Sequence, residues 1–538
     1  MSEKTSAAHA EHAQMSHKQI VAVMIGLMTG LLLAALDQSI VSTALKTITV
    51  DLGGLKHYTW VVTAYLLTST ASTPLYGKIS DLYGRRQVFQ FAIVVFLLGS
   101  FASGIAHNMN ELIASRAFQG LGAGGLMSLT FVIIGDVVSP RERGRYQGYF
   151  GAVWGLATVA GPLLGGFFSD HHHVLGVTGW RWIFYINLPF GIIALVVTSA
   201  VLHIPKVVRQ HKIDYIGALL LIVAVSVLLL GISVYAPENG WLKTKTMSWI
   251  GGGLVLFAIF LWNQAKASEP ILPLRLFKNH TFSITSILAF LVGAAMFGAI
   301  VMLPLYFQLV KGNSATLSGL KLLPLMFGIV TTSIFSGKWI TKHGKYKAFP
   351  VVGMVLMTAA LLLMGTLTET TPYWRLSIFA IMLGAGLGMC LQNLVIALQN
   401  SLEIRDMGIG TSLNTFWRSI GGTLGVAIFG SIYASKLSHY ITGNIAKLGA
   451  TNPAALAGAT PQSLGQLQNN PAIAAGFTKP LQATIDHSYV QSFHIVFFAA
   501  APVTLIGILV AIMLKATPLK TGAQHAQAMK EAAGEALG

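Results

Sequence analysis

One acidic side chain stands alone inside an apolar stretch of this sequence. Asp37 is the only one of the 18 acidic residues that falls well within an apolar run long enough to cross a membrane. A charge at such depth costs roughly 2.5–3.5 kcal/mol on insertion scales and usually marks an ion or proton path. Because removal from water disfavours a carboxylate, Asp37 is predicted to carry a proton and to be able to contact a cationic substrate. The alternative is a structural acid that a neighbouring helix satisfies.

Two arginines lie deep in other apolar runs. Arg116 and Asp37 both lie about 7–8 residues, or roughly 11–12 Å of helical rise, from the outer ends of their runs. Opposite charges at matching depth predict a pair, and protonation of Asp37 would then release Arg116; a purely structural ion pair is the alternative. Arg418 has no obvious acidic partner, so it is either a contact for an anionic group or a staple between helices.

The elements that position these residues are apolar runs of about 20 residues, the length that crosses roughly 30 Å of hydrocarbon as a helix. Hydrophobic residues make up 54% of the chain and charged residues 10%, which excludes an ordinary soluble fold. The alternating segments of a membrane barrel are not found. The sequence predicts an all-α integral membrane protein with fourteen spans near residues 19–45, 57–76, 87–106, 109–133, 146–168, 182–203, 215–235, 247–265, 281–309, 316–338, 347–367, 374–398, 409–435 and 488–514.

The net charge of +17 comes from Lys and Arg residues scattered among short loops, which argues against nucleic-acid binding. With the N-terminus inside, the inner loops and tails carry roughly twice as many of these residues as the outer loops, as the positive-inside rule requires. We therefore expect a multi-pass protein of the cell (plasma) membrane with both termini in the cytoplasm. Residues 1–17 lack the pattern of a cleaved secretory signal. Cys390, the single cysteine, excludes an internal disulfide.

The chain contains an internal repeat. Segments 77–86 and 337–345 both place Gly-Lys seven residues before Gly-Arg or Gly-Lys, although the second has Thr341 where the first has Asp81. Repeated halves with a substrate site between them are typical of secondary transporters. Six spans in each half leave two spans as a linker. The predicted parts are a tail 1–18, a six-helix bundle 19–203, a linker 204–268, a six-helix bundle 269–514 that includes a long outer loop 436–487, and a tail 515–538.

Charged residues gather at the inner ends of the first half. They predict a latch that holds helices together in one conformation and releases them in another. Gly77 and Gly84 would permit the tight turn of the first repeat loop. Membrane anchoring by the two arginines alone is the alternative. The latch residues are Asp81, Arg85, Arg86 and Asp136.

Span five is rich in glycine and contains a proline. The glycines allow helices to approach closely, and the proline removes a backbone hydrogen bond, so a kink is expected there. Ordinary close packing accounts for most of this pattern. The residues are Gly151, Gly155, Gly161, Pro162 and Gly165.

The first repeat loop resembles the loop motif of the major facilitator superfamily. Residues 112–122 and 151–166 are similar to two further motifs of that superfamily, and residues 36–41, 180–191 and 273–277 resemble its fourteen-span drug–proton antiporter branch. The resemblance covers residues 20–435 and the last helix. It implies the major facilitator fold, in which two six-helix bundles surround a central cavity, here with two added linker spans. After Asp37 the branch usually has Asn and Pro, where this chain has Ser42 and Lys46.

The resemblance implies a proton-coupled efflux transporter that exports lipophilic, often cationic drugs by alternating access. It implies proton coupling at Asp37 and Arg116, gating by the latch residues and a role for span five in preventing leak. A proton gradient would supply the energy, and the chain's partners would be the substrate, protons and membrane lipid. Export of an endogenous lipid or metabolite is the alternative, because the loop 436–487 could cover the path of an amphiphile. A channel or receptor is disfavoured by the internal repeat.

Enzyme and metal motifs are missing or misplaced. The glycine pattern at 120–125 fits a dinucleotide-binding loop but lies in an apolar helix with no strand before it. No phosphate-binding loop, zinc-protease motif or nucleophile elbow occurs. The three histidines at 171–173 lack a second group of metal ligands. We expect no enzymatic activity, no metal and no cofactor.

Overall fold

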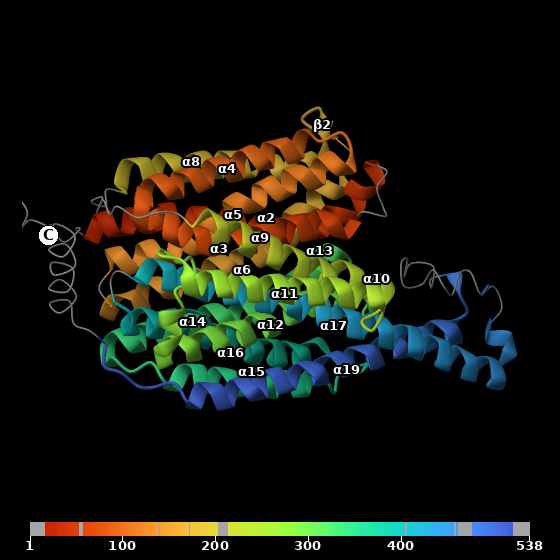
Figure 1. Ribbon diagram of the computed structural model, residues 1–538. Coiled ribbons are helices and arrows are strands. Elements are labelled where there is room, and N and C mark those ends of the chain that lie inside the picture. The colour runs from red at the N-terminus through yellow and green to blue at the C-terminus, as the bar shows by residue number, and fades with distance from the viewer. Residues whose placement is uncertain are drawn as a thin grey trace, which may run out of the picture.

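The computed structural model describes residues 17–52, 58–138, 140–171, 173–202, 214–403, 406–456, 459–460 and 476–519. Figure 1 shows that this part of the chain is a bundle of long helices, so the predicted all-α fold class is confirmed. Helices dominate because hydrocarbon offers no partner to backbone N–H and C=O groups, which must pair within the segment. The predicted tails 1–18 and 515–538 lie largely outside the described residues.

The first half of the bundle runs from α2 to α8. Its loops are short, and a two-stranded hairpin, β1 (His173–Val174) with β2 (Val177–Thr178), precedes its last helices. We call the end of the bundle that holds the 77–86 loop the inner end, because the charge bias predicts that it faces the cytoplasm. The helices are α2 (His17–Asp51), α3 (Tyr58–Tyr83), α4 (Arg85–Ile105), α5 (Met109–Val137), α6 (Pro140–Asp170), α7 (Trp182–Tyr185) and α8 (Asn187–Val201).

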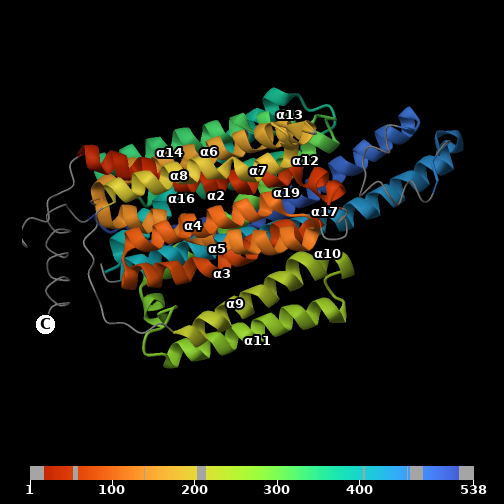
Figure 2. The same ribbon diagram turned by 90° about the horizontal axis from the view of Figure 1, so that it is seen from above.

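Two linker helices lie beside the bundle, next to α3 (Figure 2). Asp214 caps the first of them by accepting a hydrogen bond from the Gly217 N–H at 2.7 Å. Leu221 and Phe260 from this pair share a hydrophobic cluster with Phe282 of the second half. The linker elements are α9 (Tyr215–Leu230), a π-helical turn (Gly231–Tyr235), α10 (Ala236–Asn239) and α11 (Thr244–Lys266).

The second half runs from α12 to α19. Asn279 and Ser314 cap the first two of its helices by accepting hydrogen bonds from backbone N–H groups. Gly344 ends α14 in the left-handed conformation with a φ of 70°, which favours glycine. The helices are α12 (His280–Leu309), α13 (Ala315–Leu320), α14 (Leu323–His343), α15 (Ala348–Met364), α16 (Tyr373–Ser401), α17 (Met407–Thr451) and α19 (Lys479–Ile512).

The membrane-spanning helices follow the predicted apolar runs. Within the described residues, 11 helices are long and apolar enough to cross a membrane. Two shorter apolar helices, α9 and α15, and the more polar α3 coincide with the other three predicted runs. The number of fourteen spans therefore stays a prediction.

The predicted outer loop 436–487 is largely helical where the structure describes it. α17 continues to Thr451, and α19 begins at Lys479, so both helices project beyond the rest of the bundle (Figures 1 and 2). Buried side chains spaced four residues apart on α17, from Leu437 to Ile445, meet Leu481 and Ile485 of α19. The helix therefore continues past the predicted end of span thirteen near residue 435, because amphipathic packing extends it beyond the apolar run.

Each half has its own hydrophobic core. In the first half the core includes Phe89, Phe96 and Leu126. In the second it includes Leu383 and Cys390, whose thiol is fully buried and lies 3.7 Å from the carbonyl oxygen of Pro350.

The two halves also touch along close helix seams. On α6, Gly151 lies opposite Ser333 of α14, where a Cβ would come within 2.6 Å of the serine hydroxyl. At the inner end, Gly77 of α3 lies opposite Ser412 of α17, where a Cβ would come within 2.5 Å of the serine hydroxyl. Small residues thus set the spacing between the halves.

Candidate functional site

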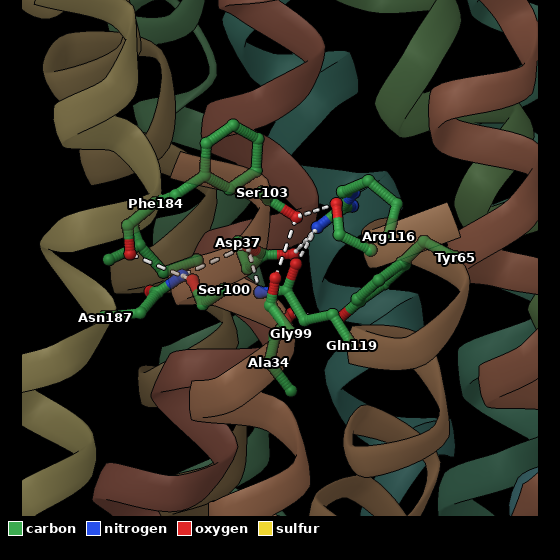
Figure 3. A network of polar contacts seen from close by, with 12 residues as sticks. Ala34, Asp37, Tyr65, Gly99, Ser100, Ser103, Arg116, Gln119, Phe184 and Asn187 are labelled. Atoms are coloured by element: carbon green, nitrogen blue, oxygen red, sulfur yellow. Dashed lines mark hydrogen bonds and ion pairs between the residues drawn. The ribbon is translucent and has the colours of Figure 1, made fainter. Parts of the chain in front are cut away.

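The centre of the first half is an enclosed ion pair (Figure 3). Arg116 on α5 donates from Nη1 to Oδ2 of Asp37 on α2 at 2.5 Å. The exposed fractions of the two side chains are 1% and 0%. The sequence predicted a pair at this depth, and the structure places the two charges in contact.

Two amide side chains complete the enclosure of Asp37. Gln119 Nε2 and Asn187 Nδ2 donate to its Oδ1 at 2.9 Å and 3.1 Å. Gln119 is held in turn by Arg116, whose Nη1 lies 2.7 Å from the amide oxygen. Asn187 is held by the Ser100 hydroxyl at 2.9 Å. Both carboxylate oxygens of Asp37 therefore have partners.

An aromatic ring covers the guanidinium of Arg116. The ring centroid of Tyr65 lies 4.1 Å from its central carbon, and the Tyr65 hydroxyl donates to the Ala34 carbonyl at 3.3 Å. Sequence reasoning did not assign roles to Tyr65, Gln119 or Asn187. Gln119 could have been suspected, because a residue three positions after Arg116 shares its helix face.

The stability of this arrangement depends on the charge of Asp37. Removing one partner of a buried ion pair is strongly destabilising, by about 3–5 kcal/mol, because it leaves an uncompensated charge. A proton on Asp37 would neutralise the carboxylate and leave Arg116 in that unfavourable state. Occupancy of Asp37 by a proton would thus favour a rearrangement of α2 against α5.

A second charge cluster lies at the inner end. Arg85 at the start of α4 contacts Asp81 of α3 at 2.5 Å and Asp136 of α5 at 2.6 Å. Gly84 between α3 and α4 has a φ of 95°, a conformation that other residues rarely adopt. The structure brings these three charged side chains together. Arg86 lies apart from them and donates to the Ser199 carbonyl at the end of α8 at 2.6 Å.

This inner cluster meets the second half of the molecule. Gly408, the second residue of α17, packs against it so closely that a Cβ would come within 2.6 Å of Asp81 Oδ1 and 2.8 Å of Arg85 Nη2. A carboxylate at a helix N-terminus is stabilised by the helix dipole. Burial raises the pKa of Asp81 above its ordinary value, and the adjacent Arg85 offsets part of this rise.

Two further basic residues near this cluster escaped sequence reasoning. Arg143 is buried and donates from Nε to the Val138 carbonyl at 2.9 Å and from Nη2 to the Gly135 carbonyl. It therefore provides hydrogen-bond donors to backbone carbonyl groups at the end of α5. Burial lowers the pKa of Arg143 to about 10, at which the side chain still carries its charge. Lys78 forms an ion pair with Glu269, which follows the linker. No pattern in the sequence predicts that Lys78 and Glu269 form an ion pair.

The motif of span five divides between two partners. Gly161 and Gly165 face α2, where a Cβ would come within 2.1 Å of the Ser39 hydroxyl and 2.7 Å of the Ile40 carbonyl, respectively. Gly155 and Pro162 face α13 and α14 of the second half, as Gly151 does, with Pro162 against Gly319. The predicted kink at Pro162 stays a prediction.

Arg418 lies on α17 at the contact between the halves. Its guanidinium carbon lies 5.3 Å from the ring centroid of Phe131 on α5. The side chain is partly exposed, and among the residues that the structure describes it has no ion pair and no hydrogen bond. It therefore does not share the enclosed arrangement of Asp37 and Arg116.

The predicted histidine group does not assemble a metal site in the described part of the chain, which contains no cluster of three or more metal-ligating side chains. His171 Nδ1 lies 2.8 Å from the Phe167 carbonyl, and His172 lies outside the described residues.

Two helical halves, an enclosed ion pair and a charge cluster at the contact between the halves are features that membrane transporters share. The sequence pattern of the Major Facilitator Superfamily matches residues 27–426. The chain therefore belongs to the Major Facilitator Superfamily and is a membrane transporter, not an enzyme.

Similar proteins include named transporters. The chain is 34% identical to the multidrug transporter protein MdtP of Bacillus subtilis (strain 168), with 96% of each chain covered. It is 38% identical to an uncharacterized MFS-type transporter of Mycobacterium tuberculosis (strain ATCC 25618 / H37Rv), over 92% of this chain and 70% of that protein. Among solved structures, the proton:xylose symporter XylE matches 95% of this chain and 99% of its own with a TM-score of 0.59 at 14% identity, a likeness of fold.

Proposed function

We propose that this chain is a proton-coupled efflux transporter that exports small lipophilic compounds, including drugs and lipophilic cations, by alternating access. The enclosed Asp37 carboxylate is the observation that carries the proposal, since it is an acid at membrane depth with a cation beside it. The relatives named multidrug transporter protein and multidrug resistance protein 3 support the substrate class.

The proposed cycle uses the two charge clusters in turn. A proton from the outer side binds Asp37, frees Arg116 and loosens α2 against α5. The cluster of Asp81, Arg85 and Asp136 opens from Gly408 at the inner end as the halves rock. Release of the proton inside restores the ion pair. The substrate would move outward in the half of the cycle that carries no proton inward.

We place the protein in the plasma membrane with both termini in the cytoplasm. The positive-inside rule supports this orientation. It also agrees with Figure 1, in which α2 begins and α19 ends at the same end of the bundle.

Uptake of ethidium into inverted membrane vesicles tests the proposal. An inside-acid pH gradient should drive uptake by the native protein, and a protonophore should abolish it. Asp37→Asn should abolish gradient-driven uptake. Asp51→Asn is the matched control, because Asp51 lies on the same helix and only accepts a hydrogen bond from Trp180 Nε1 at 2.8 Å, which asparagine also accepts.

The uptake results test the proton site and the substrate class separately. Equal gradient-driven uptake by Asp37→Asn and native protein would exclude Asp37 as the proton site while leaving efflux intact. Native vesicles that ignore ethidium would contradict export of cationic drugs.

Export of an endogenous lipid or metabolite is the second candidate. The helical hairpin that α17 and α19 form beyond the bundle favours it, because it extends the protein past the membrane on the outer side (Figure 1). The same vesicles, loaded with a fluorescent phospholipid in place of ethidium, distinguish the two candidates.

A further inference from the structure

Arg418 is a membrane-embedded cation for which the described residues provide no counter-charge. It lies 11 residues, or about 16 Å of helical rise, from the inner start of α17, near the middle of the membrane. The other arginine at such depth, Arg116, is paired with Asp37. Charged residues inside the membrane are usually paired or mark a substrate pathway.

The backbone around Arg418 is tightly held. Gly293 on α12 lies so close that a Cβ there would come within 2.1 Å of the Arg418 carbonyl oxygen. The base of the side chain is therefore fixed against its own half, while its guanidinium reaches Phe131 in the other half. This contact crosses the interface at which a rocking transporter opens and closes.

A staple between helices would need hydrogen bonds that Arg418 does not make. Within the described part of the chain, the guanidinium of Arg418 contacts the face of Phe131. The Phe131 ring is in turn packed at a tilt of 41° against Phe150, with ring centroids 4.5 Å apart. Both rings are buried, with exposed fractions of 3% and 0%. The partly exposed Arg418 thus places a cation beside the face of a buried aromatic ring.

Asp37 cannot bind a cationic group of a solute in this conformation. Its exposed fraction is 0%, and both of its oxygens are occupied by the side chains of Arg116, Gln119 and Asn187. Of the charged groups at this depth that the structure describes, the guanidinium of Arg418 is thus the one that no opposite charge already holds.

We propose that Arg418 is the anion-recognition residue of the transport path, so that the exported compounds include lipophilic aromatic molecules with a carboxylate or another anionic group. This inference rests on the proposed function, because it specifies the substrate class of the same path. The guanidinium pairs with the anionic group, and the neighbouring face of Phe131 is the apolar surface nearest to that charge.

Two planar dyes of opposite charge test the inference. Fluorescein carries a carboxylate on a phenyl ring attached to its flat xanthene ring system, and ethidium carries a positive charge within its flat ring system. In inverted vesicles with an inside-acid gradient, Arg418→Gln should lower fluorescein uptake about tenfold or more, since a charge-assisted hydrogen bond is lost. Ethidium uptake should stay within about twofold of native. Arg418→Lys should fall between native and Arg418→Gln for fluorescein, because lysine keeps the charge but not the planar fork.

Arg375→Gln is the matched control. Arg375 also stands over a phenylalanine ring, Phe379, at 5.8 Å, but it is exposed at the start of α16. This variant removes the same groups and should leave uptake of both dyes unchanged.

Fluorescein binding to purified protein, followed by fluorescence anisotropy, separates this inference from the proposed function. Binding that weakens about tenfold in Arg418→Gln supports anion recognition even if neither dye responds to the gradient, an outcome that would overturn proton-driven efflux alone. Native-like fluorescein binding and uptake in Arg418→Gln would overturn the inference. Equal loss of both dyes in this variant, with unchanged thermal stability, would overturn it too, because it would show a general role in transport.

Discussion

The two halves of this transporter treat membrane charge differently. In the first half, Asp37 and Arg116 neutralise each other and are closed off by amides and a tyrosine ring. In the second half, Arg418 is partly exposed and has no counter-charge among the described residues. The closed pair is shielded from solutes in this conformation. Arg418 is less enclosed than that pair.

The two copies of the internal repeat also differ in their charged residues. The first copy holds Asp81 and Arg85 against Asp136 and the start of α17. The second has Thr341 in place of the acid, and its hydroxyl donates to the Gly337 carbonyl of its own helix at 2.9 Å. Both copies therefore have a glycine with positive φ at the turn, Gly84 and Gly344, whereas the second has a threonine in place of the acid.

Removal of Arg116 should have the largest effect and tests the contrast between paired and unpaired charge. Arg116→Gln leaves the Asp37 carboxylate buried without its cation, which should lower the free energy of unfolding by about 3–5 kcal/mol. Arg418→Gln should lower it by no more than about 1 kcal/mol, because only the contact with Phe131 is lost. Detergent-induced unfolding of the purified protein measures both values.

The double variant Asp37→Asn with Arg116→Gln is the control for this prediction. It removes both charges and should recover part of the stability that Arg116→Gln loses. Similar losses in Arg116→Gln and Arg418→Gln would contradict the contrast between the halves.

A methyl group on Gly161 should have the next largest effect. Gly161→Ala places a Cβ within 2.1 Å of the Ser39 hydroxyl, which donates to the Ala157 carbonyl at 2.8 Å, so packing within the first half is strained. We expect a loss of about 1–3 kcal/mol in the free energy of unfolding. Gly430→Ala on α17, where no atom lies within 4 Å of the added carbon, should be neutral. A destabilised Gly430→Ala variant would show that an added methyl group is costly even where nothing packs against it, so that the Ser39 contact does not explain the effect of Gly161→Ala.

Asp81→Asn should shift the conformational equilibrium by about two- to fivefold toward opening at the inner end, since a carboxylate at a helix N-terminus is lost. Hydrogen–deuterium exchange at the inner ends of α3 and α17 measures this shift. Because burial raises the pKa of Asp81, acidification should mimic the variant at a pH where an exposed aspartate is still ionised. Lys345→Gln in the second copy should leave exchange unchanged; a shift of equal size there would remove the difference between the copies.

Lys78→Gln should have the smallest effect. The side chains of Lys78 and Glu269 are 17% and 27% exposed, so solvent screens their ion pair. We expect a change of less than about 1 kcal/mol in the free energy of unfolding. The native pair should also weaken as salt is raised, and a larger, salt-independent effect of Lys78→Gln would show that it does more than join the linker to the first half.

The sequence predicts the fold well because the membrane limits the choices of the backbone. Every predicted apolar run coincides with a helix, including the polar α3. The apolar runs do not predict that α17 continues past residue 435, because Lys436, Ser438 and His439 interrupt the apolar run while Leu437 and Ile441 continue the helical spacing. A search for helical periodicity would have found this extension.

The site is predicted less completely, for geometric reasons. Depth along a helix suggests that Asp37 faces Arg116, but it does not say which neutral side chains close around them. The sequence pattern assigns Arg86 to the same latch as Arg85. Adjacent residues on a helix point to different faces, however, and Arg86 donates a hydrogen bond to the Ser199 carbonyl. The surroundings of Arg418 are formed by α5, α12 and α17, which are far apart in the sequence, so a local sequence pattern does not predict them.

The burial of Cys390 has a practical consequence. It is the chain's only thiol, and it is fully shielded beneath the Pro350 carbonyl. The native protein is therefore a ready background for maleimide or nitroxide labelling, with no need to mutate endogenous cysteines. Pairs of labels placed on the inner ends of α3 and α17 would report directly on the distance between the halves as the protein works.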